Sequence, residues 1–437
     1  MKLPRIAFFA LLLIFCSSSA FAQSTSLIHA GKLLAVPGDD VQTEKTIVIK
    51  QGMISAVEDG YLSAEDLSLS DSEVQIIDLS DKFVLPGLID MHTHITNERD
   101  PEVNPHEWLT LYDEDFAYEA IPFLEATLQA GFTTVRNLGA AYTTINAIKR
   151  AVNKGLIEGP RIISASGGIS ATGGHGDFHG YRSEVINAFE ESVGICDGAD
   201  DCSRAVRAVV KQGADVIKIT ATGGVLSNTA AGVGQQLTDE ELEAIVKTAN
   251  MLGRKVAAHA HQAGGINAAL EAGVHSIEHG SYLDDRSVEL FNETGAYLVP
   301  TLLAGVVLLE EMEVNDDIPP AIVAKIKEVI PNVEAAFKRA LDGGVNIAFG
   351  TDSGVSKHGT NAREFELMVA YGMSNEEAIK SATIYASDLL GMSNFLGTLE
   401  AGKFADIIAV DENPLEDISS LKEVQFVMKQ GKVYSNK

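Results

Sequence analysis

Two histidines separated by one residue, His92 and His94, end the apolar stretch PGLIDMHTH at positions 86–94. Residues two apart in an extended strand point to the same face, so the two imidazoles can face one side together. Paired imidazoles on one face are typical metal ligands, although a His-x-His pair alone is a weak motif. The pair therefore predicts a metal site only if other ligands join it.

Further candidate ligands and bases stand in or directly after other strand-like segments. Lys218 is flanked by Ile217 and Ile219, and a lysine inside an apolar strand is hard to explain structurally because lysine is almost never buried unpaired. Each histidine taken singly could be a core residue or a helix cap. Besides Lys218, the candidate ligands and bases are His175 in GGHGD, His259 and His261 in VAAHAH, His279 in IEHG, and Asp352 in GTDS.

The elements that must position these groups alternate in kind. Apolar runs of strand length alternate with amphipathic segments of helix length, which predicts parallel βα units. Eight units predict an α/β fold, a (β/α)8 TIM-type barrel over residues 86–391, whose active site lies at the C-terminal ends of the strands. A doubly wound open sheet is the alternative. The strands are centred on Ile89, Val135, Ile163, Ile217, Ala258, Ile277, Val299 and Ala348.

Both ends of the chain have a different character. Residues 23–85 and 392–437 contain short β-branched runs broken by Gly and Asp, which predict antiparallel strands and one small β-sandwich domain built from both termini. Within the barrel, Thr238 and the acidic residues that follow it predict a helix over residues 239–252.

The N-terminus predicts export. Lys2 and Arg5 precede an apolar run at residues 6–15 and a small-residue ending at Ala22, which is the pattern of a signal peptide cleaved near Ala22. That run is too short for stable membrane insertion. We therefore expect a periplasmic or secreted protein, and a bacterial periplasm fits best. In an oxidising compartment, Cys196 and Cys202 are expected to form a disulfide, with free thiols or a calcium-binding acidic loop as alternatives.

Charge limits the partners of the 437-residue chain. Its net charge is −28 and its pI about 4.7, which argue against nucleic acid and anionic membranes. A small-molecule or dipeptide substrate remains, and a homo-oligomer is compatible with the sequence.

The whole constellation resembles the amidohydrolase superfamily. GGHGD at 173–177, VAAHAH at 256–261 and HGTN at 358–361 resemble the Xaa-Pro dipeptidase (prolidase-like) and imidazolonepropionase-like branch. The resemblance implies two divalent metal ions, usually zinc, with a carbon dioxide-derived carbamate on Lys218, an N6-carboxylysine, between them. It implies His92, His94 and Asp352 on one ion, and His259 and His279 on the other, with His261 as the alternative to His259.

The expected reaction is hydrolysis of an amide bond by a hydroxide that bridges the metals. Asp352 would take the proton and return it to the leaving nitrogen, and His175 would stabilise the oxyanion. His175, His261 and Tyr282 are predicted to contact substrate. Arg136 is a candidate to bind the substrate carboxylate, and Arg182, Lys357 and Arg363 are the other candidates, among which the sequence does not choose.

Two other functions remain open. An imidazolonepropionase-type or other cyclic-amide hydrolase or deaminase would use a single metal on His92, His94, a later histidine and Asp352, and Lys218 argues against it. A non-catalytic exported binding protein on the same fold is the second, although such a protein would be expected to lose ligands.

Overall fold

The computed structural model describes residues 25–101, 103, 106–182, 184–185 and 194–437. The expected signal peptide at residues 1–22 lies outside them. The helices are α1 (Asp113–Gln129), α2 (Tyr142–Asn153), α4 (Ala199–Lys211), α5 (Asp239–Met251), α6 (Ala263–Ala272), α7 (Asp285–Thr294), α8 (Leu302–Val314), α9 (Pro320–Asp342), α10 (Arg363–Ala370), α11 (Asn375–Lys380) and α12 (Ala386–Leu390). Short 3₁₀ segments occupy Glu65–Leu67, Asp71–Glu73, Glu107–Thr110 and Ile418–Lys422, and a π-helical turn occupies Ser381–Tyr385.

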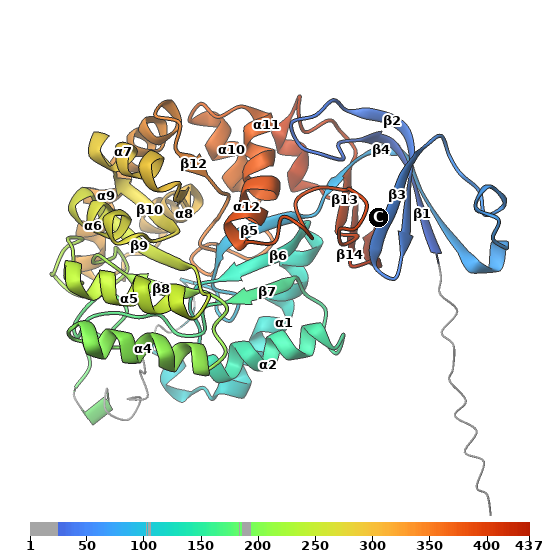
Figure 1. Cartoon of the computed structure of the whole chain (residues 1–437). Helices are drawn as coiled ribbons and strands as arrows, with labels where there is room; N and C mark the ends of the chain where they lie inside the picture. Colours follow the sequence, from blue (N-terminus) through green and yellow to red (C-terminus); the bar gives the residue numbers. More distant parts are fainter. Residues whose placement is uncertain (1–24, 102, 104–105, 183, 186–193) are drawn as a thin grey trace, which may run out of the picture.

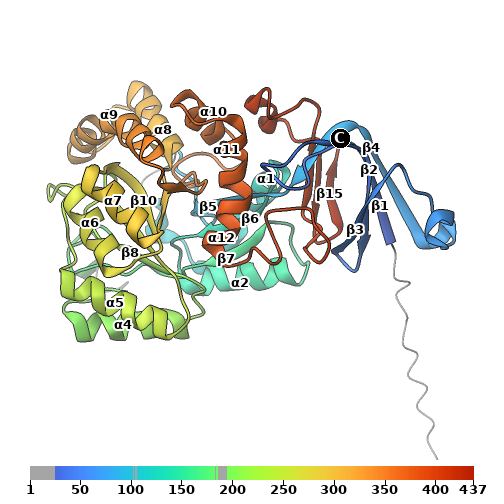
Figure 2. The ribbon, with the colours of Figure 1, turned by 45° about the horizontal axis from the view of Figure 1, so that its top comes forward.

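Strands from both ends of the chain form one seven-stranded sheet at one end of the molecule (Figures 1 and 2). The order is β15-β14-β13-β4-β1-β2-β3, and β1 pairs in parallel with β4. The structure therefore corrects the expected sandwich of antiparallel strands to a single mixed sheet. Its strands are β1 (Thr25–Leu33), β2 (Gln42–Lys50), β3 (Met53–Asp59), β4 (Val74–Pro86), β13 (Ile407–Val410), β14 (Phe426–Lys429) and β15 (Lys432–Asn436).

Gly87 joins this sheet to the parallel strands. Its N–H donates to the carbonyl of Asp406, and a Cβ at this position would lie 2.4 Å from Oγ1 of Thr133. Only glycine fits so close an approach. The chain therefore passes directly from β4 into β5 (Leu88–Thr93), the strand that carries His92 and ends just before His94.

The remaining strands are parallel and lie where the sequence predicted them. They pair as two sheets, in the orders β5-β6-β7 and β12-β11-β10-β9-β8. Seven of the eight predicted centres fall inside these strands, and Ala348 directly follows the last of them. The strands are β5 (Leu88–Thr93), β6 (Phe132–Asn137), β7 (Arg161–Ser164), β8 (Ile217–Thr220), β9 (Val256–Gln262), β10 (Ser276–Tyr282), β11 (Tyr297–Val299) and β12 (Asn346–Ile347).

Backbone hydrogen bonds also connect the two parallel sheets at both of their edges. Beyond β7, the N–H of Ile169 donates to the carbonyl of Lys218 on β8 at 2.8 Å. At the other edge, the N–H of Met91 on β5 donates to the carbonyl of Phe349, which follows β12, at 2.9 Å. The ends of β5, β8, β9 and β10 are thereby held near one another.

Helices lie outside the parallel strands (Figure 1). The predicted helix after Thr238 is α5, and the hydroxyl of Thr238 accepts a hydrogen bond from the N–H of Glu241, as a capping box requires. Cys196 and Cys202 are joined by a disulfide beside the first turn of α4. None of the helices in the described part of the chain is long and apolar enough to cross a bilayer.

Candidate metal centre and substrate cavity

The polar residues at the strand ends line a single cavity of about 310 Å³. They come from β5, β8, β9, β10, the loop after β7 and the segment after β12, so the tertiary structure brings together groups up to 260 positions apart (352 less 92). The sequence-predicted residues in the cavity lining are His92, His94, His175, Lys218, His259, His261, His279 and Asp352.

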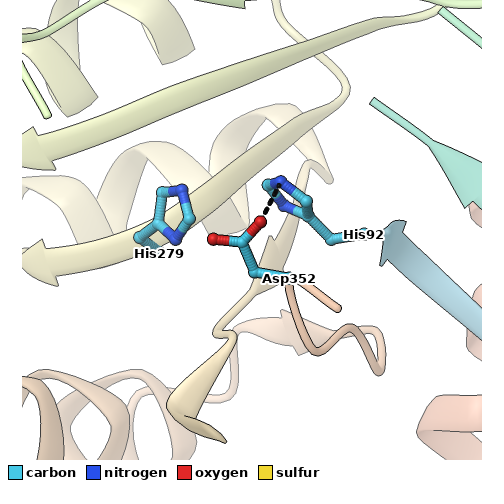
Figure 3. Close-up of side chains that lie close together, drawn as sticks. All are labelled: His92, His279 and Asp352. Atoms are coloured by element: carbon cyan, nitrogen blue, oxygen red, sulfur yellow. Dashed lines mark ion pairs between the residues drawn. The ribbon is translucent and has the colours of Figure 1, made fainter. Parts of the chain in front are cut away.

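His92, His279 and Asp352 form the tightest group in this lining. One ligand atom from each lies within 4.8 Å of the others. Figure 3 shows the Asp352 carboxylate between the two imidazoles, with Oδ1 3.3 Å from Nε2 of His92. Nε2 of His94 lies 3.2 Å from the same oxygen. Three nitrogens and a carboxylate that converge in this way fit a divalent transition metal such as zinc.

Lys218 reaches the same centre from β8. Its Nζ lies 3.5 Å from Nε2 of His92, and the side chain is buried. Burial penalises the ammonium form and lowers the pKa of Lys218 to about 8. A larger fraction of this amine than of an ordinary lysine amine is therefore neutral near neutral pH.

Four buried imidazoles of the candidate centre, those of His92, His259, His261 and His279, are held neutral, as metal ligation requires. Burial, with a smaller contribution from the charge of Lys218, lowers the pKa of His92 and of His261 to about 4, although the Asp352 carboxylate acts in the opposite direction. Burial also lowers the pKa values of His259 and His279 well below the ordinary range. For Asp352, burial raises the pKa, but the interaction with His92 and the hydrogen bond from His94 lower it by more, so the carboxylate stays ionised.

Each imidazole directs one nitrogen to a neighbour and keeps the other for the centre. His92 Nδ1 donates to Glu278 at 3.0 Å, and His94 Nδ1 donates to the carbonyl of Gly139 at 3.1 Å. His279 Nδ1 lies 2.7 Å from the hydroxyl of Thr301. Such partners fix the orientation and tautomer of a ligating histidine.

His259 and His261 are oriented through opposite nitrogens. His259 Nε2 lies 3.3 Å from the carbonyl of Gly223, whereas His261 Nδ1 lies 2.8 Å from the hydroxyl of Ser281. Both rings line the cavity, so both remain candidate ligands.

Two of the candidate ligands have a strained backbone. His279 has φ 74° and Asp352 has φ 60°, in the left-handed region that non-glycine residues rarely adopt. Asp90, buried on β5, holds the Asp352 segment by accepting hydrogen bonds from the hydroxyl of Thr351 at 2.6 Å and the amide of Asn361 at 2.8 Å. This network maintains a conformation that would otherwise relax.

His175 lies over His259, with ring centroids 4.3 Å apart. Its backbone N–H donates to the amide oxygen of Gln236 at 2.8 Å, and its Nδ1 contacts the hydroxyl of Ser227. Burial lowers the pKa of His175 to about 3, so the ring is neutral. The loop after β7 therefore presents a neutral, oriented imidazole to the cavity.

The structure places two of the predicted substrate contacts, Arg136 and Tyr282, outside the cavity lining that it describes. Arg136 is fully buried, and its guanidinium donates to the Met91 carbonyl, Ser276 and Glu278 instead of lining the cavity. The hydroxyl of Tyr282 donates to the carbonyl of Glu328 outside the cavity. Both side chains satisfy partners from distant strands or helices, which sequence spacing cannot reveal.

The other cationic candidates also lie away from the lining that the structure describes. Arg363 pairs with Glu310 on α8, and Arg182 and Lys357 are exposed. Within the described residues, Lys218 is therefore the one Lys or Arg that lines the cavity.

Sequence reasoning assigned no role to two residues that support the site. Glu278, beside His279, orients His92. Lys325 on α9 is buried and donates to the carbonyls of Gly224 at 2.7 Å and Ser227 at 2.6 Å. Lys325 shares the helical spacing of Ile322, Ile326 and Val329, and a lysine on an apolar helix face is the signal that could have found it.

Comparisons with known proteins agree with this geometry. The model of the amidohydrolase family matches residues 83–434. A solved Xaa-Pro dipeptidase with methionine bound in its active site is 41% identical, with a TM-score of 0.88 over 94% of this chain and 100% of that one.

Two sequence relatives extend the comparison. Ochratoxinase of Aspergillus niger is 32% identical over 94% of this chain and 86% of its own length. Imidazolonepropionase of Rhizobium rhizogenes is 23% identical over 87% of this chain and 89% of its own. The chain belongs to the amidohydrolase family and is a hydrolase of amide or peptide C–N bonds.

Proposed function

We propose that this protein is an exported dipeptidase, for Xaa-Pro or related dipeptides, that works with two divalent metal ions. The observation that carries the proposal is the convergence of His92, His279 and Asp352 around one point, with Lys218 3.5 Å from His92. The likeness to an Xaa-Pro dipeptidase at 41% identity supports the substrate class.

Each proposed ligand has a place in this scheme. His92, His94 and Asp352 would hold one ion, and His259 and His279 the other, with His261 as the alternative to His259. Neutral imidazole nitrogens favour zinc. The strand ends would form the C-terminal face of a closed eight-stranded barrel, which the backbone hydrogen bonds at both sheet edges support. The barrel would span residues 86–391, with residues 23–85 and 392–437 as the small β-domain.

Lys218 would be carboxylated. Its neutral amine attacks carbon dioxide, a C–N bond forms, and one proton leaves to solvent. The pKa of about 8 makes that amine available near neutral pH. The carbamate would be an anion with two oxygens, so Lys218 would supply a negatively charged ligand to the metal centre.

The bound ions supply Lewis acidity for the substrate carbonyl and lower the pKa of a water. Asp352 would accept the proton of the attacking water and return it to the leaving nitrogen. The Ser227 hydroxyl would donate to His175 Nδ1, which leaves the Nε2–H of His175 to donate to the developing oxyanion.

Export is proposed from the N-terminal pattern. The disulfide between Cys196 and Cys202 supports an oxidising compartment, a periplasm or the exterior. Its loop lies away from the cavity lining.

The test combines metal analysis with a dipeptide library. We expect two metals per chain, loss of hydrolysis with a chelator, and recovery with metal and bicarbonate. Lys218→Ala should lose at least one metal and most activity, whereas Lys327→Ala, at an exposed position on α9, should lose neither. One metal per chain at full activity would favour the imidazolonepropionase-type alternative. Equal cleavage of substrates with blocked and free carboxyl termini would exclude a dipeptidase.

A further inference from the structure

One side of the cavity is apolar, opposite in character to the histidine-rich side. It is formed by the loop after β8, by helices α8 and α9, and by the segment after β12. We call this surface the apolar wall, and define it by Val225, Leu226, Leu308, Ile330, Val333 and Val355.

The apolar wall is a packed structure. α8 and α9 pack on each other at Gly305, where a Cβ would lie 3.2 Å from Cδ1 of Ile330. Lys325 donates to the carbonyls of Gly224 and Ser227 and so ties the loop that carries Val225 to α9. The wall therefore has a defined shape before any ligand binds.

Within the described residues, none of the side chains that line this side of the cavity is charged. The charged side chains of the lining, Lys218 and Asp352, both lie at the histidine-rich end. A charged substrate group against the apolar wall would lose its hydration without gaining a partner. An aliphatic or aromatic group would instead leave water for a surface of matching character.

We propose that the apolar wall is the subsite for a large uncharged side chain next to the scissile amide. The preferred substrates would then be amides, dipeptides among them, with an aliphatic or aromatic side chain adjoining the bond that is cut. This inference rests on the proposed function, because it takes the histidine-rich end as the place where the amide carbonyl binds.

Two dipeptide series test the proposal with the metal-loaded enzyme. In the first, Ala, Leu, Phe, Glu or Lys precedes proline, and in the second the same residues follow alanine. In at least one series, the kcat/KM of the Leu or Phe dipeptide should be about tenfold higher than that of the Ala dipeptide. It should be about a hundredfold higher than the kcat/KM of the Glu and Lys dipeptides. Equal or higher values for Glu or Lys in both series would overturn the proposal.

Substitutions in the wall should change this ratio. Val333→Asp places a carboxylate in the wall at a partly exposed position, and should shift the Lys-to-Leu ratio of kcat/KM toward Lys at least tenfold. Leu309→Asp is the matched control, because Leu309 lies on α8 but is exposed outside the cavity lining. The control should leave the ratio unchanged. The same shift in both variants would overturn the assignment.

A second variant guards against misfolding of the first. Ile330→Ala removes apolar surface without adding charge, and should reduce the Leu-to-Ala ratio of kcat/KM at least threefold. Each ratio is taken within one enzyme preparation, so a general loss of metal or activity cancels. If the enzyme hydrolyses the dipeptides in a metal-dependent way but does not prefer apolar side chains, the subsite assignment is wrong and the proposed function stands. Failure to hydrolyse any member would overturn the proposed function and the subsite with it.

Discussion

The Nδ1 atom of His92 lies 3.0 Å from Oε2 of Glu278, and both side chains are buried. The other carboxylate oxygen of Glu278 accepts from Nη2 of Arg136 at 2.8 Å. Burial raises the pKa of Glu278, but the charge of Arg136 outweighs it, so the pKa is lowered and the carboxylate stays ionised. The pair thereby turns Nε2 of His92 toward Asp352.

Glu278→Gln should weaken metal binding about 10- to 100-fold, because the amide holds the His92 ring less firmly than the carboxylate does. Competition with a chromophoric chelator measures this affinity. Glu311→Gln is the matched control, since Glu311 is also buried and paired with an arginine, Arg99, but lies outside the cavity lining. If Glu278→Gln binds metal as tightly as the control does, the proposed orienting role is wrong.

Lys325→Met should lower kcat more than it alters KM. The substitution leaves the carbonyls of Gly224 and Ser227 without their ammonium donor, so the Ser227 hydroxyl that contacts His175 loses its anchor. Displacement of a catalytic group by about 1 Å can cost about a hundredfold in rate. Steady-state kinetics on the best dipeptide measures the change, with Lys327→Met, at an exposed position on the same helix, as control. Equal kcat in the two variants would contradict the prediction.

Glu364 should make the stability of the protein fall as pH rises. Its buried carboxylate accepts from the N–H groups of Leu302 and Leu303 at the start of α8, and burial raises its pKa from 4.5 to about 8. The folded state therefore holds the proton more tightly than the unfolded state does. The stabilisation is complete below about pH 4.5 and is lost as pH approaches 8.

Glu364→Gln removes this titration. Its free energy of unfolding should increase relative to that of the wild type between pH 5 and pH 8, measured by urea denaturation at several pH values. A constant difference across that range would show that Glu364 does not titrate as described.

Removal of the disulfide should destabilise the protein by about 2 kcal/mol, the loss expected when a short covalent loop opens in the unfolded chain. Cys196 and Cys202 are six positions apart and both buried. The double variant Cys196→Ala/Cys202→Ala should unfold at a lower denaturant concentration than the oxidised wild type. Addition of a reductant should lower the unfolding midpoint of the wild type but not that of the variant. Reaction of both thiols with an alkylating reagent in unreduced, unfolded protein would rule the disulfide out.

Local sequence patterns predicted the elements well. Strand length and apolar character located the parallel strands, and Thr238 predicted the start of α5, because both signals depend on residues a few positions apart. Which strands pair with each other depends instead on residues far apart in the chain. The parallel contact between β1 and β4, which excludes a simple antiparallel sandwich, joins segments almost fifty positions apart, Thr25 with Val74.

For the site, the sequence by itself determined which chemical groups stand at the strand ends, since residue type and alternation along a strand are local properties. It therefore predicted the histidines, Lys218 and Asp352 of the cavity. Only the tertiary structure decided that Arg136 turns inward, because its partner Glu278 is 142 positions away. The tertiary structure also decided which residues form the apolar wall, since loops and helices far apart in the chain bury their side chains against one another only after folding.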